Sequence, residues 1–327
     1  MTGKFGKLAL MALVVAIATT RAAGAASNYP DRPIKMIVTF AAGGSSDVLA
    51  RVVANSMAKG LGKQIVIENR PGAGGQIGAE VVAHAEPDGY TLLFGTNGTL
   101  AIGPALYEHL RYDPLKDLAP VGLLQKLPLV LIANPSVPVK NLKELIAYAR
   151  ANPGKLTYAS AGVGSVSHLS AELLKSAANI DLLHVPYRGG GAAIHDLISG
   201  QVSMMLETIP NALPLIRGGQ MRALGVTTHS RSAAAPDLPT LDEQGLAGFD
   251  VGGWTGLFAP AGTPPAIIAR LNAETVKITS DPDYLDHLKK MGTDVASSTP
   301  EELAAFMRKD ISNWTGAVKK AGVKKIE

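Results

Sequence analysis

The sequence predicts an α/β fold in two lobes, each a mainly parallel sheet flanked by helices. Short apolar runs rich in β-branched residues alternate with segments of helical periodicity along the chain. This alternation is typical of βαβ units, whose strands pair in parallel. The 327 residues exceed one domain of ordinary size, and a hydrophobic content of 46% is enough for two cores.

The first 26 residues are predicted to be an export signal. Lys4 and Lys7 precede an apolar run over residues 8–18, and small residues suited to cleavage follow at 22–26. Eleven apolar residues are too few to cross a hydrocarbon core of about 30 Å. We therefore expect a signal peptide over residues 1–26 and a periplasmic mature protein.

Charge and composition exclude several kinds of partner. The formal net charge is +4, and Lys4, Lys7 and Arg21 of the predicted signal account for three of these charges, which leaves +1. A nearly neutral chain with 5% aromatic residues does not have the composition of a nucleic-acid-binding protein. The chain has no cysteine, so thiolate metal ligands and thiol nucleophiles are absent. We expect no nucleic-acid partner, no metal and no cofactor.

The first part of the chain repeats a strand, a small-residue loop and a helix. Apolar β-rich runs at residues 33–40, 64–68 and 90–94 are each followed by a loop rich in glycine, serine or threonine. After the first loop, apolar residues at helical spacing predict a helix that ends at Gly60 and Gly62. We expect Ser46 and Asp47 to cap its N-terminus.

The second part continues the same order of elements. We predict strands at residues 129–133, 156–160, 182–186, 202–206, 221–226 and 254–258. Asn141, with Glu144 three residues later, predicts a helix start, and Thr299 with Glu302 predicts the start of the last of three C-terminal helices. We also expect helices directly after the loops at 161–165 and 187–191.

Motifs of common enzyme classes are missing. The glycines at 72 and 74 imitate a dinucleotide fingerprint, but its third glycine would fall on Ile77. No phosphate loop, nucleophile elbow or pair of histidines at helical spacing occurs. We expect His168 and His195 to be helix-surface residues and the protein not to be an enzyme. A secreted hydrolase that uses Ser46 or Ser165 is kept as an alternative.

Four loops favour an anion-binding site instead. The loops at residues 41–47, 95–99, 160–167 and 187–192 follow strands and precede helices. Such loops meet at the carboxyl ends of parallel strands, where bare backbone N–H groups and helix N-termini attract anions. Residues 40–49 also resemble residues 160–169, which suggests one such loop in each lobe. Together they predict a carboxylate held between the lobes by N–H groups and hydroxyls.

Six segments carry a resemblance to a known family. They are residues 38–47, 68–75 (ENRPGAGG), 87–93, 187–191, 200–202 and 256–264. In this order the chain resembles, from Tyr29 to its C-terminus, the solute receptors of tripartite tricarboxylate transporters, also called Bug proteins. The ENRPGAGG segment is the most specific of them.

The resemblance implies a type II periplasmic-binding-protein fold with the ligand in a cleft between the lobes. Lobe 1 would comprise residues 27–127 plus 252–327, and lobe 2 residues 128–251. The ligand would be a small organic carboxylate, namely a di- or tricarboxylate, an acidic amino acid or an aromatic acid. A monomeric receptor would deliver it to a two-component membrane permease. A ligand-sensing receptor for a membrane signalling kinase would share this fold and is the second alternative.

The resemblance also nominates residues that bind the ligand. From lobe 1 they are Phe40, Ala41, Gly44, Ser45 and Ser46, with Thr96 as a further cleft residue, and from lobe 2 Ser160, Ala161, Gly164, Ser165 and Tyr187. Two positions depart from the family pattern, because Thr39 replaces a frequent proline and Glu207 replaces a usual aspartate. Glu207 is included among the ligand-binding candidates, and its longer side chain disfavours an amino-acid ligand if this position contacts the amino group.

Overall fold

The computed structural model describes residues 29–40, 42–187 and 190–327. The predicted signal peptide and Ala41 lie outside these residues. Among the described residues, ten strands form a sheet in the order β2-β1-β3-β9-β4-β7-β5-β6, and β8 and β10 both pair with β4. No helix in these three ranges is long and apolar enough to cross a membrane.

The strands and helices follow the order expected from the sequence. The strands are β1 (Ile34–Val38), β2 (Ile65–Asn69), β3 (Thr91–Thr96), β4 (Leu118–Ala133), β5 (Thr157–Ser160), β6 (Leu183–Pro186), β7 (Met204–Thr208), β8 (Arg222–Val226), β9 (Gly252–Pro260) and β10 (Asp294–Val295). The helices are α2 (Ser45–Leu61), α3 (Gln76–Ala83), α4 (Gly103–Leu106), α5 (Leu142–Ala151), α6 (Val166–Ala178), α7 (Gly190–Ile198), α8 (Ile209–Arg217), α9 (Pro265–Ile278), α10 (Pro282–Lys290) and α11 (Pro300–Lys320), with the short turns η1 (Ala73–Gly75) and η2 (Gly98–Ile102).

The predicted α/β fold in two lobes is confirmed, and its sheet is mixed. The outer strands pair in parallel, β1 with β2 and β3 in one lobe and β5 with β6 and β7 in the other. The central strands β4 and β9 pair antiparallel with each other and with their neighbours. Parallel βαβ units therefore form the two ends of the sheet, and an antiparallel centre joins them.

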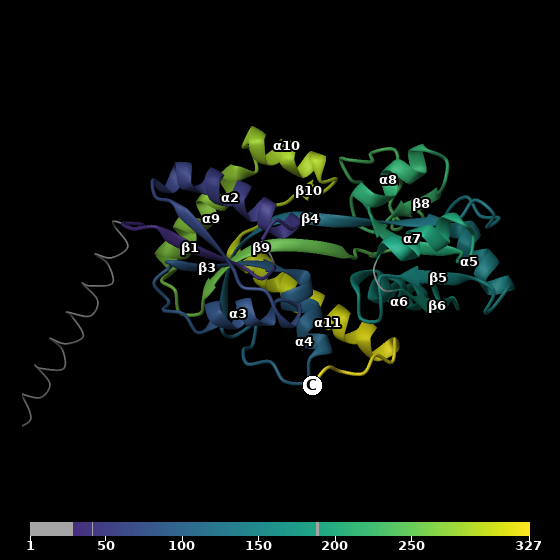
Figure 1. Cartoon of the computed structure of the whole chain (residues 1–327), viewed down its shortest axis with the longest axis horizontal. Coiled ribbons are helices and arrows are strands. Elements are labelled where there is room, and N and C mark those ends of the chain that lie inside the picture. Colours follow the sequence, from purple (N-terminus) through teal and green to yellow (C-terminus); the bar gives the residue numbers. More distant parts are fainter. Residues whose placement is uncertain (1–28, 41, 188–189) are drawn as a thin grey trace, which may run out of the picture.

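The long strand β4 passes from one lobe into the other (Figure 1). Its residues 118–128 pair with β9, and its residues 129–133 pair with β7. The sequence predicted only the second part, because Pro120 and Pro128 interrupt the apolar pattern of the first. The register shifts between Pro120 and Gly122, and such an irregularity is one of the places where a strand accepts proline.

Three clusters of buried side chains form the core. One fills lobe 1 between the sheet, α2 and α9, and another fills lobe 2 around α7 and β7. The third runs through both lobes and includes Trp254 of β9, Met307 and Trp314 of α11 and Leu169 of α6. Helix α11 packs against α4 and α6 and so connects the two lobes beside the sheet (Figure 1).

The N-cap residues of the helices can be compared with those predicted from the sequence. The side chains of Asn141 and Thr299 accept the backbone N–H groups of Glu144 and Glu302, and Thr299 forms the predicted capping box. The capping role expected of Ser46 and Asp47 is wrong, because Gly44 is the N-cap residue of α2 and makes no side-chain cap.

Candidate functional site

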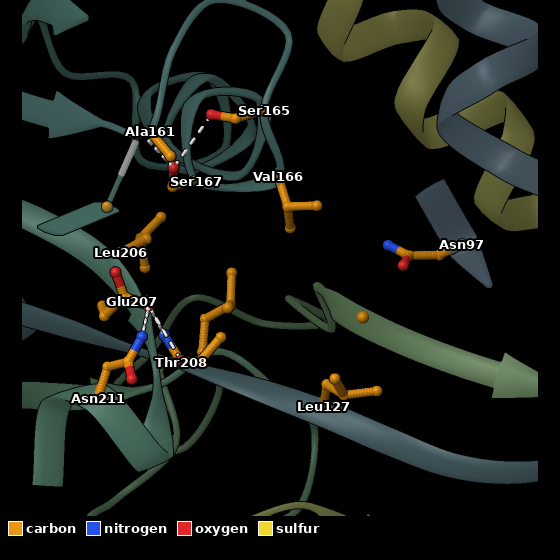
Figure 2. Close-up of a pocket in the computed structure, with 13 residues that line it drawn as sticks. Asn97, Leu127, Ala161, Ser165, Val166, Ser167, Leu206, Glu207, Thr208 and Asn211 are labelled. Carbon is orange, nitrogen blue, oxygen red and sulfur yellow. Dashed lines mark hydrogen bonds between the residues drawn. The ribbon is translucent and has the colours of Figure 1, made fainter. Parts of the chain in front are cut away.

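A cavity of about 360 Å³ lies between the two lobes. Asn97, directly after β3, Leu127 of β4 and Gly253 of β9 line it from lobe 1, and the remaining lining residues come from lobe 2 (Figure 2). These are Leu129, Ala161, Ser165, Val166, Ser167, Gly190, Leu206, Glu207, Thr208 and Asn211. The lobe 2 residues come from β4, the loop before α6 with the start of α6, the start of α7, and the end of β7 with the first turn of α8.

The structure brings three of the predicted ligand-binding residues together at this cavity: Ala161, Ser165 and Glu207. The other described candidates do not line it. Phe40 and Gly44 are exposed, Ser46, Gly164 and Tyr187 are half-buried, and Thr96 and Ser160 are buried. Ala41 lies outside the described residues, and of Ser45 the structure describes only its place at the start of α2.

Several lining residues were not among the candidates. Asn97 and Ser167 lie in two of the four loops that the sequence predicts to bind an anion. Their position in those loops was the signal that could have identified them. The junction of the lobes provides three more: Leu127 of β4, Gly253 of β9 and Asn211 of α8. Only the pairing of Leu127 with Gly253 brings these two side by side.

The loop before α2 is held by the carboxylate of Asp47. The backbone N–H of Gly43 donates to Asp47 Oδ2 at 2.9 Å, and Asn69 Nδ2 donates to Asp47 Oδ1 at 3.0 Å. Asn69 Nδ2 also donates to the carbonyl of Phe40 at 3.0 Å, and Arg51 contacts both carboxylate oxygens. Hydrogen bonds from Arg51, Gly43 and Asn69 lower the pKa of Asp47 to about 2. An ionised Asp47 therefore holds Gly43 beside Asn69 of β2, which also binds the carbonyl of Phe40.

The loop before α6 is held by hydroxyls and a histidine. Ser165 caps α6 by accepting the backbone N–H of His168, and its Oγ lies 3.1 Å from Ser167 Oγ. Ser167 Oγ accepts the backbone N–H of Ala161 at 3.0 Å, as the dashed lines of Figure 2 show. The backbone N–H of Gly164 donates to His168 Nδ1 at 3.1 Å. These bonds shape the wall of the cavity formed by residues 161–167.

A stack of three rings lies beneath this loop. The rings of Tyr158 and His184 stack at 4.8 Å, and those of His184 and His168 at 4.0 Å. His168 is 3% exposed, so its predicted surface position is wrong, whereas His195 is exposed as predicted. Ser160 Oγ lies 2.7 Å from His184 Nε2, yet Ser160 is fully buried. This serine–histidine pair supports the loop and does not face the cavity.

The stack makes stability depend on pH. Burial, followed by the neighbouring His168, lowers the pKa of His184 from 6.5 to about 4, and burial also lowers the pKa of His168. Glu172 opposes both shifts and Lys175 adds to them. As the pH falls, the unfolded chain takes up these protons first. The contribution of the neutral histidines to the stability of the fold is therefore complete above pH 6.5 and is lost progressively down to about pH 4.

Between pH 7 and pH 4.5, we expect His184→Phe to lose roughly 2 kcal/mol less stability than the wild type loses. Phenylalanine keeps the stack but has no group that titrates. Urea unfolding at the two pH values measures the difference, and His195→Phe, on the exposed face of α7, serves as the control. Equal pH dependence in wild type and His184→Phe would contradict the role of the stack.

Glu207 places a carboxylate at the wall of the cavity. Its Oε1 accepts from the backbone N–H of Thr208 at 2.7 Å, from Thr208 Oγ1 at 2.9 Å and from Asn211 Nδ2 at 3.2 Å (Figure 2). The residue is only 8% exposed. The cavity thus combines hydroxyls and amides that donate hydrogen bonds with one firmly held acceptor.

Comparison with known proteins gives one family. Residues 49–323 match the model of a family described as "Tripartite tricarboxylate transporter family receptor". The protein BugT of Bordetella pertussis is 37% identical over 318 residues, which are 97% of this chain and 98% of BugT.

Solved structures of similar proteins include bound and ligand-free examples. MatC from Rhodopseudomonas palustris, solved with bound malate, is 42% identical with a TM-score of 0.66 over 89% of this chain and all of MatC. A TctC solute-binding protein from Polaromonas, solved without ligand, is 27% identical with a TM-score of 0.82 over 89% of this chain and 99% of that protein.

Proposed function

This chain belongs to the tripartite tricarboxylate transporter family of receptors, and from that premise we propose that it binds a small organic carboxylate in the cavity between its lobes. It would do so outside the cytoplasmic membrane, after export directed by residues 1–26. As a monomer it would deliver the ligand to a two-component membrane permease. Binding without chemical turnover is the proposed activity.

The lining of the cavity supports this ligand class. Ser165, Ser167 and Asn97 offer groups that can donate hydrogen bonds without a cationic side chain. Hydrogen bonds to an ionised ligand are roughly twice as strong as those between neutral groups, so a few fixed donors are enough. The malate held by MatC is an acid of this kind.

We further propose that the lobes, residues 27–127 plus 252–327 and residues 128–251, close on the ligand. The junction would lie where β4 exchanges β9 for β7, at Pro128 and Leu129. The match to the ligand-free Polaromonas receptor exceeds that to malate-bound MatC despite lower sequence identity. This order supports an open arrangement of the lobes in the present structure. Closure would bring Phe40, Gly44 and Ser46, which do not line the cavity in this structure, onto the ligand.

Isothermal titration with a panel of acids tests the proposed function. The panel contains malate, citrate, glutamate and benzoate, each added to the mature protein after removal of copurified ligand. We expect saturable heat with at least one acid and none with the corresponding amides. If no acid produces heat, carboxylate binding by this chain is refuted.

Ser165→Ala is expected to weaken binding of the responding acid by about ten- to a hundredfold. A hydrogen bond to a charged group contributes roughly 1.5–3 kcal/mol, and 1.4 kcal/mol corresponds to tenfold in affinity. The same substitution removes the cap of α6, so the matched control is Asn141→Ala. That variant removes the cap of α5 away from the cavity. If both variants bind with wild-type affinity, the carboxylate lies elsewhere.

A further inference from the structure

A second cavity of about 350 Å³ adjoins the first. It is lined by Leu127, Pro128, Thr208, Pro210, Asn211, Met291, Gly292 and Thr293. Leu127, Thr208 and Asn211 also line the first cavity, so these three residues border both cavities. The candidate carboxylate site and the second cavity therefore adjoin at these residues.

The second cavity also lies between the lobes. Met291, Gly292 and Thr293 connect α10 to β10, and Pro210 belongs to the first turn of α8 in the other lobe. A Cβ built on Gly292 would lie 3.1 Å from Pro210 Cγ, and Gly292 has a φ of +60°. The two segments therefore approach each other closely at a position where glycine suits both the contact and the backbone.

The chemistry of the second cavity differs from that of the first. Its donor groups are already paired, since Thr208 Oγ1 and Asn211 Nδ2 donate to Glu207 and Thr293 Oγ1 donates to Gln125 Oε1 at 2.9 Å. The side chains that remain to meet a ligand are mostly apolar. They are Leu127, Pro128, Pro210 and Met291.

We propose that the second cavity binds the apolar part of the ligand, so that the preferred substrate is a carboxylic acid with an alkyl or aryl group. This inference rests on the proposed function, because it requires the carboxylate in the first cavity. The apolar part extends from the first cavity past the shared residues Leu127 and Asn211 and packs against Met291 and Pro210. Each methylene buried in this way raises affinity about fourfold.

Titration of two ligand series tests the proposal. Straight-chain monocarboxylates from butanoate to octanoate and phenylalkanoates are compared with malate as a short polar reference. We expect affinity to rise with chain length until the cavity is filled. Met291→Trp fills the second cavity and should weaken octanoate and phenylpropanoate at least tenfold while leaving malate within twofold. Met291→Phe, a smaller change, should give an intermediate loss.

The matched control is Leu285→Trp, which places a tryptophan at an exposed position of α10 outside both cavities. If affinity does not rise with chain length, or if Met291→Trp weakens malate as much as octanoate, the second cavity does not bind the apolar part. Binding of malate without any longer acid would overturn this inference alone. Absence of binding by every acid would refute the proposed function as well.

Discussion

Replacing Trp254 by alanine should lower the free energy of unfolding by about 3–5 kcal/mol. Trp254 is 1% exposed and belongs to the core cluster that runs through both lobes. Its ring lies 6.2 Å from that of Phe258 and 5.7 Å from that of Phe306, and its Nε1 donates to Asp310 Oδ2 at 2.6 Å. Truncation leaves a large cavity between β9 and α11.

Urea unfolding of wild type and Trp254→Ala measures the loss of stability. Two further variants serve as comparisons. Trp254→Phe retains ring packing but removes the donor to Asp310. Burial raises the pKa of Asp310 to about 6, so this carboxylate is charged mainly above that pH. Trp254→Phe should therefore lose more stability at pH 8 than at pH 5. Val276→Ala, half-exposed on α9, should change stability little. A loss below 1 kcal/mol for Trp254→Ala would contradict the packing described here.

The second large effect is expected at Asp47, where Asp47→Asn should weaken ligand binding at least tenfold. The carboxylate accepts hydrogen bonds from Gly43, Asn69 and Arg51. An amide of the same shape has one acceptor oxygen and must direct its NH₂ group at one of these donors. Gly43 then loses the bond that fixes its position, although the substituted side chain does not line the cavity.

Titration with the acid identified for the wild type measures the effect of Asp47→Asn. The control is Glu68→Gln, because Glu68 is also an ion-paired carboxylate near this loop but bonds to Lys35 and Arg70 instead. Thermal unfolding of both variants shows whether they fold alike. Unchanged affinity in Asp47→Asn would mean that the loop before α2 takes no part in binding.

Local signals in the sequence predicted much of the fold. The Asn141 and Thr299 caps and the alternation of apolar runs depend on neighbours within a few residues, so the chain itself displays them. The family resemblance, which came from six such segments, is confirmed by the family model. The first part of β4 was missed because proline usually ends a strand, and only its pairing with β9 shows why Pro120 is tolerated.

The site was predictable where it depends on loops. Ala161 and Ser165 were found because small and hydroxyl residues follow a strand there. Leu127 and Gly253 were not found, because they lie 126 positions apart in the sequence and an antiparallel pairing brings them together. The misplaced His168 has a similar cause, since its partner His184 comes from a separate strand. Contacts between distant segments thus limited the prediction.

The place of β9 in the sheet has a consequence for folding during synthesis. β9 lies between β3 and β4, although it follows both by more than a hundred residues. Before residues 252–260 are synthesised, β1–β3 have no strand that joins them to β4. The strands β5–β8, in contrast, can already pair with their neighbours in the sheet. The N-terminal strands are therefore the last to gain their partner strand, and a chain shortened before Gly252 leaves the edge of β3 uncovered.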